Sequence, residues 1–232
     1  MTIEEQVFQR KRFLPKALLQ YGFQTVPEGY RYTTCFHDNE FKCILNVSEE
    51  GAVNGTVIDS LNDEEFLQLR IENFNGAYVN SIRSAYQDVL QEIAERCCYE
   101  VYFVSDQANR IADRIFASYD VKPDFPWGRS PHECSGTFRH ADTQKWFALI
   151  MRIRSGILQK NDNAEFIDVM NLKSDPERSE ALCRINGIYP AYHMNHKKWI
   201  TVVLNDVLTD DRIMELVEES YRLTSKERGK VK

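Results

Sequence analysis

The chain has 232 residues, of which 43% are hydrophobic and 28% are charged, and its net charge is −6. This length suits one large domain or two small ones, and the composition is ordinary for a soluble globular protein. No apolar run approaches the ~20 residues of a membrane span, and the opening Met-Thr-Ile-Glu-Glu does not form a secretory signal. We therefore expect a cytoplasmic protein with no membrane partner.

The charge is unevenly distributed along the chain. Residues 1–121 contain 11 Lys and Arg against 19 Asp and Glu, whereas residues 122–232 contain 18 against 16. A generic nucleic-acid binder is usually basic overall, and this chain is not. Any attraction for a polyanion must therefore come from positive groups that gather locally in the second half.

The first half predicts a mixture of helices and hairpins. Apolar residues recur at helical spacing over 2–21, and Pro15 is expected to kink or divide this helix. Turn-forming segments then separate three candidate strands, at residues 30–36, 41–47 and 52–58. A short helix ending at Leu69 follows, then a long amphipathic helix over 78–98 and an extended segment to about residue 104.

The second half predicts a larger sheet between helices. A helix capped by Ser105 or Asp106 runs to about Tyr119, and an irregular segment with several prolines, including Pro131, comes next. The strands expected after it are residues 134–140, 145–154, 166–172 and a hairpin over 191–204, whose first strand is 191–195. Further helices begin near residues 174–177 and 209–210, and the Lys/Arg-rich tail after Thr224 is expected to fray.

These elements predict an α+β protein with two similar-sized domains, residues 1–104 and 105–232. The second should contain an antiparallel sheet of four or more strands, because only residues 175–184 offer a helix that could cross between parallel strands. Two pairs of similar short segments suggest that the two halves are degenerate repeats. Thr34-Cys-Phe-His37 resembles Thr137-Phe-Arg-His140, and Val57-Ile-Asp59 resembles Phe166-Ile-Asp168.

The sequence contains no recognisable catalytic set. It has neither a Gly-rich phosphate loop nor a nucleophile elbow, and its six cysteines are scattered without a Cys-x-x-Cys pair. His193 and His196 lie three residues apart, but no carboxylate or cysteine lies nearby to complete a metal site. We therefore expect a non-enzymatic protein with no catalytic residue, no metal ion and no cofactor.

Residues 187–204 hold an unusual density of aromatic and polar groups. Tyr192, His193 and Asn195 offer hydrogen-bond donors and acceptors beside aromatic walls, which is typical of a pocket for a small ligand. The more ordinary reading of the histidines is that they are hydrogen-bonded or exposed to solvent.

Positive side chains of the second half fall on predicted strands or hairpin ends, where they could meet a phosphate backbone. The candidates for nucleic-acid binding are Arg139, Lys145, Lys173, Lys197 and Lys198. Trp146, Trp199 and Tyr192 are close enough in sequence to stack on bases. The strand positions of the two tryptophans nevertheless favour packing in a core, and we expect both to be largely buried.

Several motifs of the second half occur in order and resemble one family. They are Asp124-Phe-Pro-Trp-Gly128, Phe138, Lys145-Trp-Phe-Ala148, Asn171-Leu-Lys-Ser-Asp-Pro176, Tyr189-Pro-Ala-Tyr-His-Met-Asn195, Lys198-Trp-Ile-Thr201 and Ser220-Tyr221. Together they resemble the MmcQ/YjbR family of small bacterial proteins over roughly residues 106–224. The first hundred residues lie outside this resemblance.

The resemblance implies a CyaY-like fold, in which helices pack on one face of an antiparallel sheet. It also implies DNA binding, a label that the family carries through its likeness to a double-wing type of DNA-binding domain, and no established enzymatic activity. Fold likeness alone is only an analogy for function. We therefore expect a non-enzymatic binding protein with DNA as its leading partner, and another protein or a small ligand as the alternative.

Overall fold

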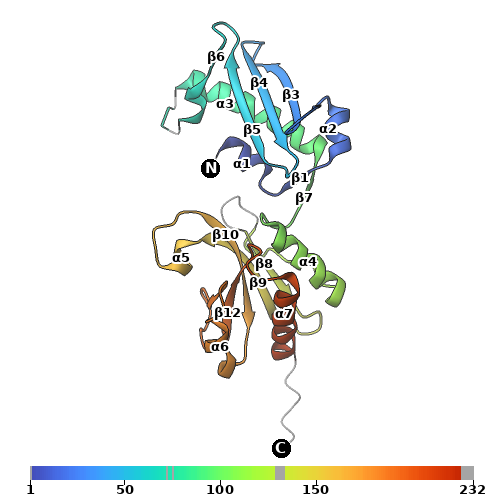
Figure 1. Ribbon diagram of the computed structural model, residues 1–232, viewed down its shortest axis with the longest axis vertical. Coiled ribbons are helices and arrows are strands. Elements are labelled where there is room, and N and C mark those ends of the chain that lie inside the picture. Colours follow the sequence, from blue (N-terminus) through green and yellow to red (C-terminus); the bar gives the residue numbers. More distant parts are fainter. Residues whose placement is uncertain (1, 72, 75, 129–133, 226–232) are drawn as a thin grey trace, which may run out of the picture. The chain divides into compact units, whose positions relative to one another are not determined.

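The computed structural model describes residues 2–71, 73–74, 76–128 and 134–225, which fall into two compact units, Met1–Val101 and Tyr102–Lys232 (Figure 1). The boundary expected from the sequence, after residue 104, lies three residues beyond the boundary after Val101 in the structure. Each unit has its own hydrophobic core. Pro131 and the basic tail beyond residue 225 lie outside the described residues.

The first unit begins with two short helices, α1 (Ile3–Phe8) and α2 (Pro15–Tyr21). The helix expected over 2–21 is therefore divided, which is one of the two effects expected of Pro15, but the strand between its two parts was not predicted. Strand β1 (Lys11–Phe13) separates the two helices and pairs antiparallel with β7 (Cys98–Glu100). Pro15 starts α2 instead of kinking a longer helix, because its fixed φ suits the first turn and its missing N–H has no partner there anyway.

The main sheet of the first unit is antiparallel and follows chain order. Its five strands are β2 (Gln24–Val26), β3 (Gly29–Phe36), β4 (Phe41–Ser48), β5 (Val53–Asp59) and β6 (Glu64–Glu65). The short helix expected to end at Leu69 is replaced by β6 and a 3-10 turn, η1 (Leu67–Arg70). The long helix α3 (Ala77–Cys97) packs its apolar side, including the fully buried Tyr86, into the core.

The second unit also holds a five-stranded antiparallel sheet. Its strands are β8 (Ser135–Arg139), β9 (Trp146–Arg154), β10 (Phe166–Lys173), β11 (Ile188–Pro190) and β12 (Trp199–Val203), in the order β11-β12-β10-β9-β8. The helices are α4 (Asp106–Tyr119), α5 (Gly156–Gln159), α6 (Pro176–Leu182) and α7 (Asp210–Thr224). The predicted α+β class and antiparallel sheet are confirmed.

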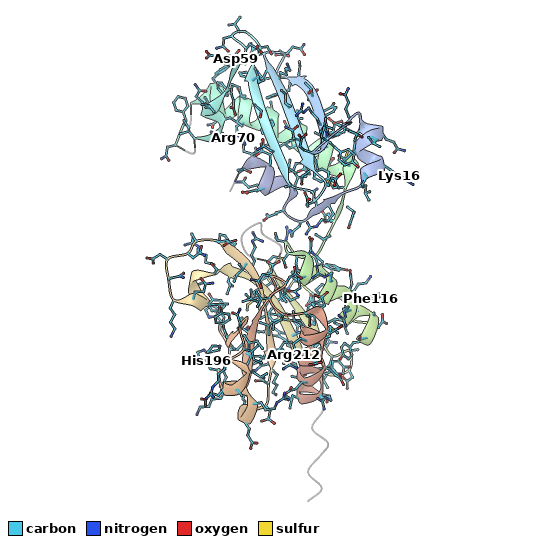
Figure 2. The ribbon with its side chains drawn as sticks, in the orientation of Figure 1. Lys16, Asp59, Arg70, Phe116, His196 and Arg212 are labelled. Atoms are coloured by element: carbon cyan, nitrogen blue, oxygen red, sulfur yellow. The ribbon has the colours of Figure 1, made fainter. Side chains whose placement is uncertain are left out.

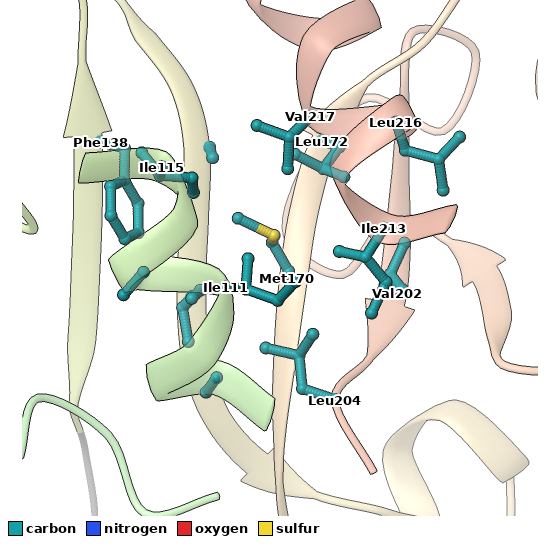
Figure 3. Close-up of a cluster of buried hydrophobic side chains, with 14 of the residues drawn as sticks. Ile111, Ile115, Phe138, Met170, Leu172, Val202, Leu204, Ile213, Leu216 and Val217 are labelled. Atoms are coloured by element: carbon teal, nitrogen blue, oxygen red, sulfur yellow. The ribbon is translucent and has the colours of Figure 1, made fainter. Parts of the chain in front are cut away.

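Helices α4 and α7 cover one face of this sheet, as the resemblance implied. Figure 3 shows the two helices side by side, with Ile111 and Ile115 of α4 and Ile213 and Val217 of α7 directed at strand residues such as Met170. Ser105 and Thr209 cap the two helices, each accepting a hydrogen bond from a first-turn amide. In the described part of the chain, no helix is both long enough and apolar enough to cross a membrane.

The opposite face of the sheet carries a smaller apolar cluster and a loop. Leu149, Met151 and Val169 are buried there, and Tyr192 and Met194 pack against the cluster. The strand expected at 191–195 is wrong, since β11 ends at Pro190. Hydrogen bonds to side chains take the place of strand pairing in this loop. The backbone N–H of Tyr192 donates to the Thr201 hydroxyl (2.8 Å), and the side-chain amide of Asn171 donates to the Tyr192 carbonyl (2.7 Å).

Candidate functional site

Several strand ends of the second unit meet at one end of its sheet. Arg139 at the end of β8 is paired with Trp146 at the start of β9, and Lys173 at the end of β10 is paired with Trp199 at the start of β12. Because neighbouring antiparallel strands run in opposite directions, these positions lie at the same end of the sheet. Residues that are 60 positions apart in sequence are thereby brought together.

A hollow of about 580 Å³ lies at this end. Its described lining consists of Lys145, Trp146, Lys173 and Trp199, together with Leu223 and Thr224 at the end of α7 and the capping residue Ser225. We call it the tryptophan hollow. It unites two of the five basic residues predicted from the sequence with the two tryptophans, although the sequence placed those rings in the core.

The expectation that Trp146 and Trp199 are largely buried is met only in part, because neither is fully buried. Both lie at strand ends, and the alternation of side chains along β9 and β12 places them on the face of the sheet opposite α4 and α7. A register irregularity between Phe138 and Arg139 also places Phe147 in the helix-side core, with no exposed area, and leaves Trp146 to pack against the cluster on the other face.

The two tryptophans of the hollow differ in what touches them. The Arg139 guanidinium lies over the Trp146 ring at 5.2 Å, and Trp127 meets that ring edge-on at 5.5 Å. Within the described residues, no aromatic ring or guanidinium lies against Trp199. Trp146 is therefore held in a fixed cluster, whereas Trp199 has no such aromatic or cationic neighbour among the described residues.

Trp127 is a member of this cluster that the sequence reasoning did not assign. It is 61% exposed, in a loop that is anchored where Asp124 bridges Thr137 through two backbone hydrogen bonds. Its position between a proline and a glycine was a signal, because a tryptophan in a turn has few neighbours to bury it. With Trp127, Trp146 and Trp199, this region contains all three tryptophans of the chain.

The predicted basic residues fall into two groups. Lys145, Lys197 and Lys198 are exposed and Lys173 is half-buried, and none of the four forms an ion pair with a described residue. Arg139 differs because its guanidinium also lies 3.4 Å from the Asp124 carboxylate. Four of the five positive charges are thus free to bind an anion.

The alternative ligand site at Tyr192, His193 and Asn195 has a different organisation. The Tyr192 ring lies against the His193 ring at 3.9 Å, and His193 itself is exposed. Asn195 shapes the turn before β12, where its side chain accepts from the Lys197 amide (2.9 Å). His196 is exposed in the same turn (Figure 2). Across the described residues, no three His, Cys, Asp or Glu side chains gather to hold a metal ion.

A buried serine of α7 sets the spacing of the strands behind the hollow. The paired register of β9 and β10 ends at Ala148 and Leu172. At the next position the Ser220 hydroxyl stands between the strands, donating to the Phe147 carbonyl and accepting from the Lys173 amide (2.8 Å). The hydroxyl thereby satisfies two buried backbone groups where the strands part.

The C-terminal end of α7, which forms one wall, is capped by hydroxyls. Thr224 donates to the Ser220 carbonyl and Ser225 to the Arg222 carbonyl, both at 2.7 Å. Nε2 of the buried His140 ring is hydrogen-bonded to the Thr224 hydroxyl (2.8 Å), and burial lowers the pKa of His140. These bonds occupy carbonyls that would otherwise present partial negative charge to an anion in the hollow.

The first unit directs its main polar cluster inward. Glu4, 2% exposed, accepts two hydrogen bonds of 2.7 Å from Arg70 and one from the Tyr86 hydroxyl, and Arg70 also donates to the Gly55 carbonyl (Arg70 is labelled in Figure 2). Burial alone would raise the pKa of Glu4, but the bonds from Arg70 and Tyr86 outweigh it and lower that pKa. A Cβ atom at Gly55 would lie 1.8 Å from the Tyr86 hydroxyl, so the cluster also requires a glycine.

Comparison with known proteins identifies relatives of the second unit. The model of the family described as YjbR matches residues 103–223, which confirms the resemblance inferred over 106–224. "Uncharacterized protein YyaQ" of Bacillus subtilis is 38% identical over 114 residues, covering 49% of this chain and 94% of that protein. "Uncharacterized protein YbdF" of Escherichia coli O157:H7 is 31% identical over 75 residues, covering 32% of this chain and 62% of that protein.

Solved structures give similar partial matches. A crystal structure of a Pseudomonas syringae protein is 43% identical, with a TM-score of 0.46, and covers 50% of this chain and 96% of that one. A Deinococcus radiodurans protein is 25% identical, with a TM-score of 0.37, and covers 51% of this chain and 81% of that one.

Proposed function

This chain belongs to the YjbR family, and we propose that its second unit is a non-enzymatic domain that binds nucleic acid at the tryptophan hollow. One observation carries the proposal. In a chain of net charge −6, four lysines without an acidic partner among the described residues lie on the hollow or on the turn that leads into Trp199. Free cations beside accessible aromatic rings are what a nucleic acid needs, because it offers phosphates and flat bases together.

The electrostatics of the site favour a modest affinity with a clear salt dependence. Each phosphate neutralised on duplex DNA contributes about 0.9 to the slope of log affinity against log salt, so four lysine contacts give a slope of about −3.6. The excess of acidic residues in 1–121 slows the encounter through long-range repulsion. Binding should therefore be readily measured at low salt and weak at high salt.

The described lining of the hollow supports binding rather than catalysis. It holds lysines, tryptophans, a leucine and two hydroxyls, and neither a carboxylate nor an imidazole that could serve as a general base. Thr224 and Ser225 already donate their hydroxyl protons to carbonyls of α7. A small planar anion is the second candidate ligand, because the volume of the hollow lies within the range of small-molecule pockets, roughly 300–1,000 Å³.

The test compares two double variants of the full chain that change the net charge equally. Lys145→Glu/Lys173→Glu alters the hollow, whereas Lys16→Glu/Lys160→Glu alters exposed lysines of α2 and of the end of α5. Fluorescence anisotropy of a labelled oligonucleotide is measured at low and moderate salt. The hollow variant should lose at least about tenfold in affinity at low salt and show a flatter salt slope, while the control stays close to the wild type.

Two results would contradict the proposal. If the wild type fails to bind nucleic acid at low salt, where the attraction is strongest, the proposed function is wrong. If both double variants lose affinity equally, the attraction depends on net charge alone and the hollow is not the site.

A further inference from the structure

We propose that the tryptophan hollow receives an unstacked base, so that this protein selects single-stranded nucleic acid over duplex. The inference rests on the proposed function and adds the class of nucleic acid. It follows from which aromatic ring is free, which groups surround that ring, and what a duplex can present to it.

Trp199 is the ring that can stack on a base. Its backbone is fixed by pairing with Lys173 in β10, and the ring is half-buried on the wall of the hollow. Trp146 is less suited, because Arg139 and Trp127 already lie against its ring. A base that enters the hollow therefore finds one held aromatic surface on Trp199 and a second wall formed by the fixed Trp146 cluster.

The lysines are placed to bind the phosphates of the same strand. Lys173 lies directly across the ladder from Trp199, at the spacing of opposed residues in a sheet, and Lys145 precedes Trp146 in the lining. Lys197 and Lys198 lead into Trp199 along the chain. Lysines thus lie next to the stacking ring both across the ladder and along the chain, and single-strand binders combine such positive groups with a stacking ring to follow a backbone while stacking its bases.

A duplex does not satisfy this arrangement. Both faces of each internal base are covered by its neighbours, so Trp199 could reach one only after the base is unstacked, at a cost of a few kcal/mol. Reading the major groove instead requires an inserted helix or ribbon with side chains directed at base edges. The hollow lies within the end of a sheet, and its ring offers a flat surface that accepts any base.

The experiment uses the full chain and three probes of equal length, a labelled oligo-dT, the same strand with abasic sites throughout, and a duplex. Anisotropy is measured at one salt concentration. The oligo-dT should bind about tenfold or more tightly than the duplex and the abasic strand, because stacking on one base is worth about tenfold.

Trp199→Leu and Trp199→Phe then identify the ring. Trp199→Leu should weaken oligo-dT binding about tenfold, leave duplex binding unchanged and keep the salt slope, whereas Trp199→Phe should retain most of the affinity. Phe116→Leu is the matched control, because Phe116 is an exposed ring on α4 outside the hollow (Figure 2). Thermal unfolding of each variant confirms that the unit is folded.

The outcomes separate this inference from the proposed function. Equal binding of the three probes, with no effect of Trp199→Leu, would overturn single-strand selection and leave nucleic-acid binding standing. Loss of duplex and oligo-dT binding together in Trp199→Leu would assign Trp199 a structural role and also overturn it. Failure of every probe to bind the wild type removes both proposals.

Discussion

Two groups of positive side chains, one in each unit of this chain, are placed differently. In the first, Arg70 turns onto the buried Glu4 and donates to it twice, so its charge is neutralised inside the unit. In the second, Lys145 and Lys173 line an open hollow and form no ion pair with a described residue. A buried charge needs a partner, whereas a charge in solvent can remain unpaired at little cost.

This difference separates side chains that hold the fold from those free to bind. The Glu4–Arg70–Tyr86 cluster joins α1, η1 and α3, and changes to it should affect stability alone. The lysines of the hollow make no such connection, so changes to them should affect binding alone. All three tryptophans lie in the second unit, so their fluorescence follows its unfolding, whereas far-UV circular dichroism follows both units.

The largest effect should come from replacing the inward aromatic ring. Tyr86 has no exposed area, and Tyr86→Ala should destabilise the first unit by about 3–5 kcal/mol, while Trp199→Ala should cost the second unit only about 1–2 kcal/mol because its ring is half-buried. Urea unfolding checks both values. If Trp199→Ala is as costly as Tyr86→Ala, the ring of Trp199 supports the fold and is not free for a ligand.

A smaller loss should follow from breaking the ionic cluster. Arg70→Ala leaves the Glu4 carboxylate buried without its cation, and we expect a cost of about 3 kcal/mol, near the low end for buried pairs because Arg70 is itself partly exposed. The unfolding detected by circular dichroism should shift while the tryptophan transition stays in place. Arg96→Ala is the control, since its ion pair with Glu92 is exposed and contributes at most about 1 kcal/mol. Equal losses in the two variants would show that the cluster is not stabilising.

The smallest effect should be a pH dependence at the wall of the hollow. Burial, together with Lys145, lowers the pKa of His140, and Asp142 acts in the opposite direction. Because the unfolded chain takes up this proton near pH 6.5 and the folded unit resists it, the stabilisation is complete above about pH 6.5 and is lost as the pH falls through the lowered pKa.

His140→Gln should therefore flatten the fall in stability of the second unit below about pH 6.5, as followed by tryptophan fluorescence during urea unfolding. The same change at the exposed His196 is the matched control. A variant that keeps the wild-type slope would contradict a role for His140 in the pH dependence.

Local patterns in the sequence predicted much of the fold. The strands over 134–154, the long helix ending near Cys97 and the caps at Ser105 and Thr209 all follow from periodicity and turn chemistry. The pairing of β1 with β7 was missed, because two three-residue strands almost 90 positions apart have no local pattern of their own. The residues after Pro190 predict a strand but form a loop, because the hydrogen bonds to Asn171 and Thr201 that hold the loop are tertiary and leave no local pattern.

The candidate site was only partly predictable. Charge identifies the lysines, but the hollow beside Trp146 and Trp199 forms where α7 ends, and no pattern within β9 or β12 contains that information. The repeat hypothesis stays a prediction. Thr34-Cys-Phe-His37 and Thr137-Phe-Arg-His140 both close a strand before a hairpin, whereas Val57-Ile-Asp59 ends β5 and Phe166-Ile-Asp168 begins β10.

Ser220 does not line the hollow, but it connects the two strands behind the hollow to α7. The Ser220 hydroxyl oxygen on α7 is hydrogen-bonded to β9 and to β10 at the same time. The separation of these two strands and the position of the helix against the sheet therefore change together. A ligand that moved β9 and β10 apart would have to break the hydrogen bond from the Lys173 amide to Ser220. That amide proton would then exchange with solvent more quickly. For a ligand that moves the strands apart in this way, occupancy of the hollow and the docking of α7 would be thermodynamically linked, and the exchange rate of the Lys173 amide proton would report on both.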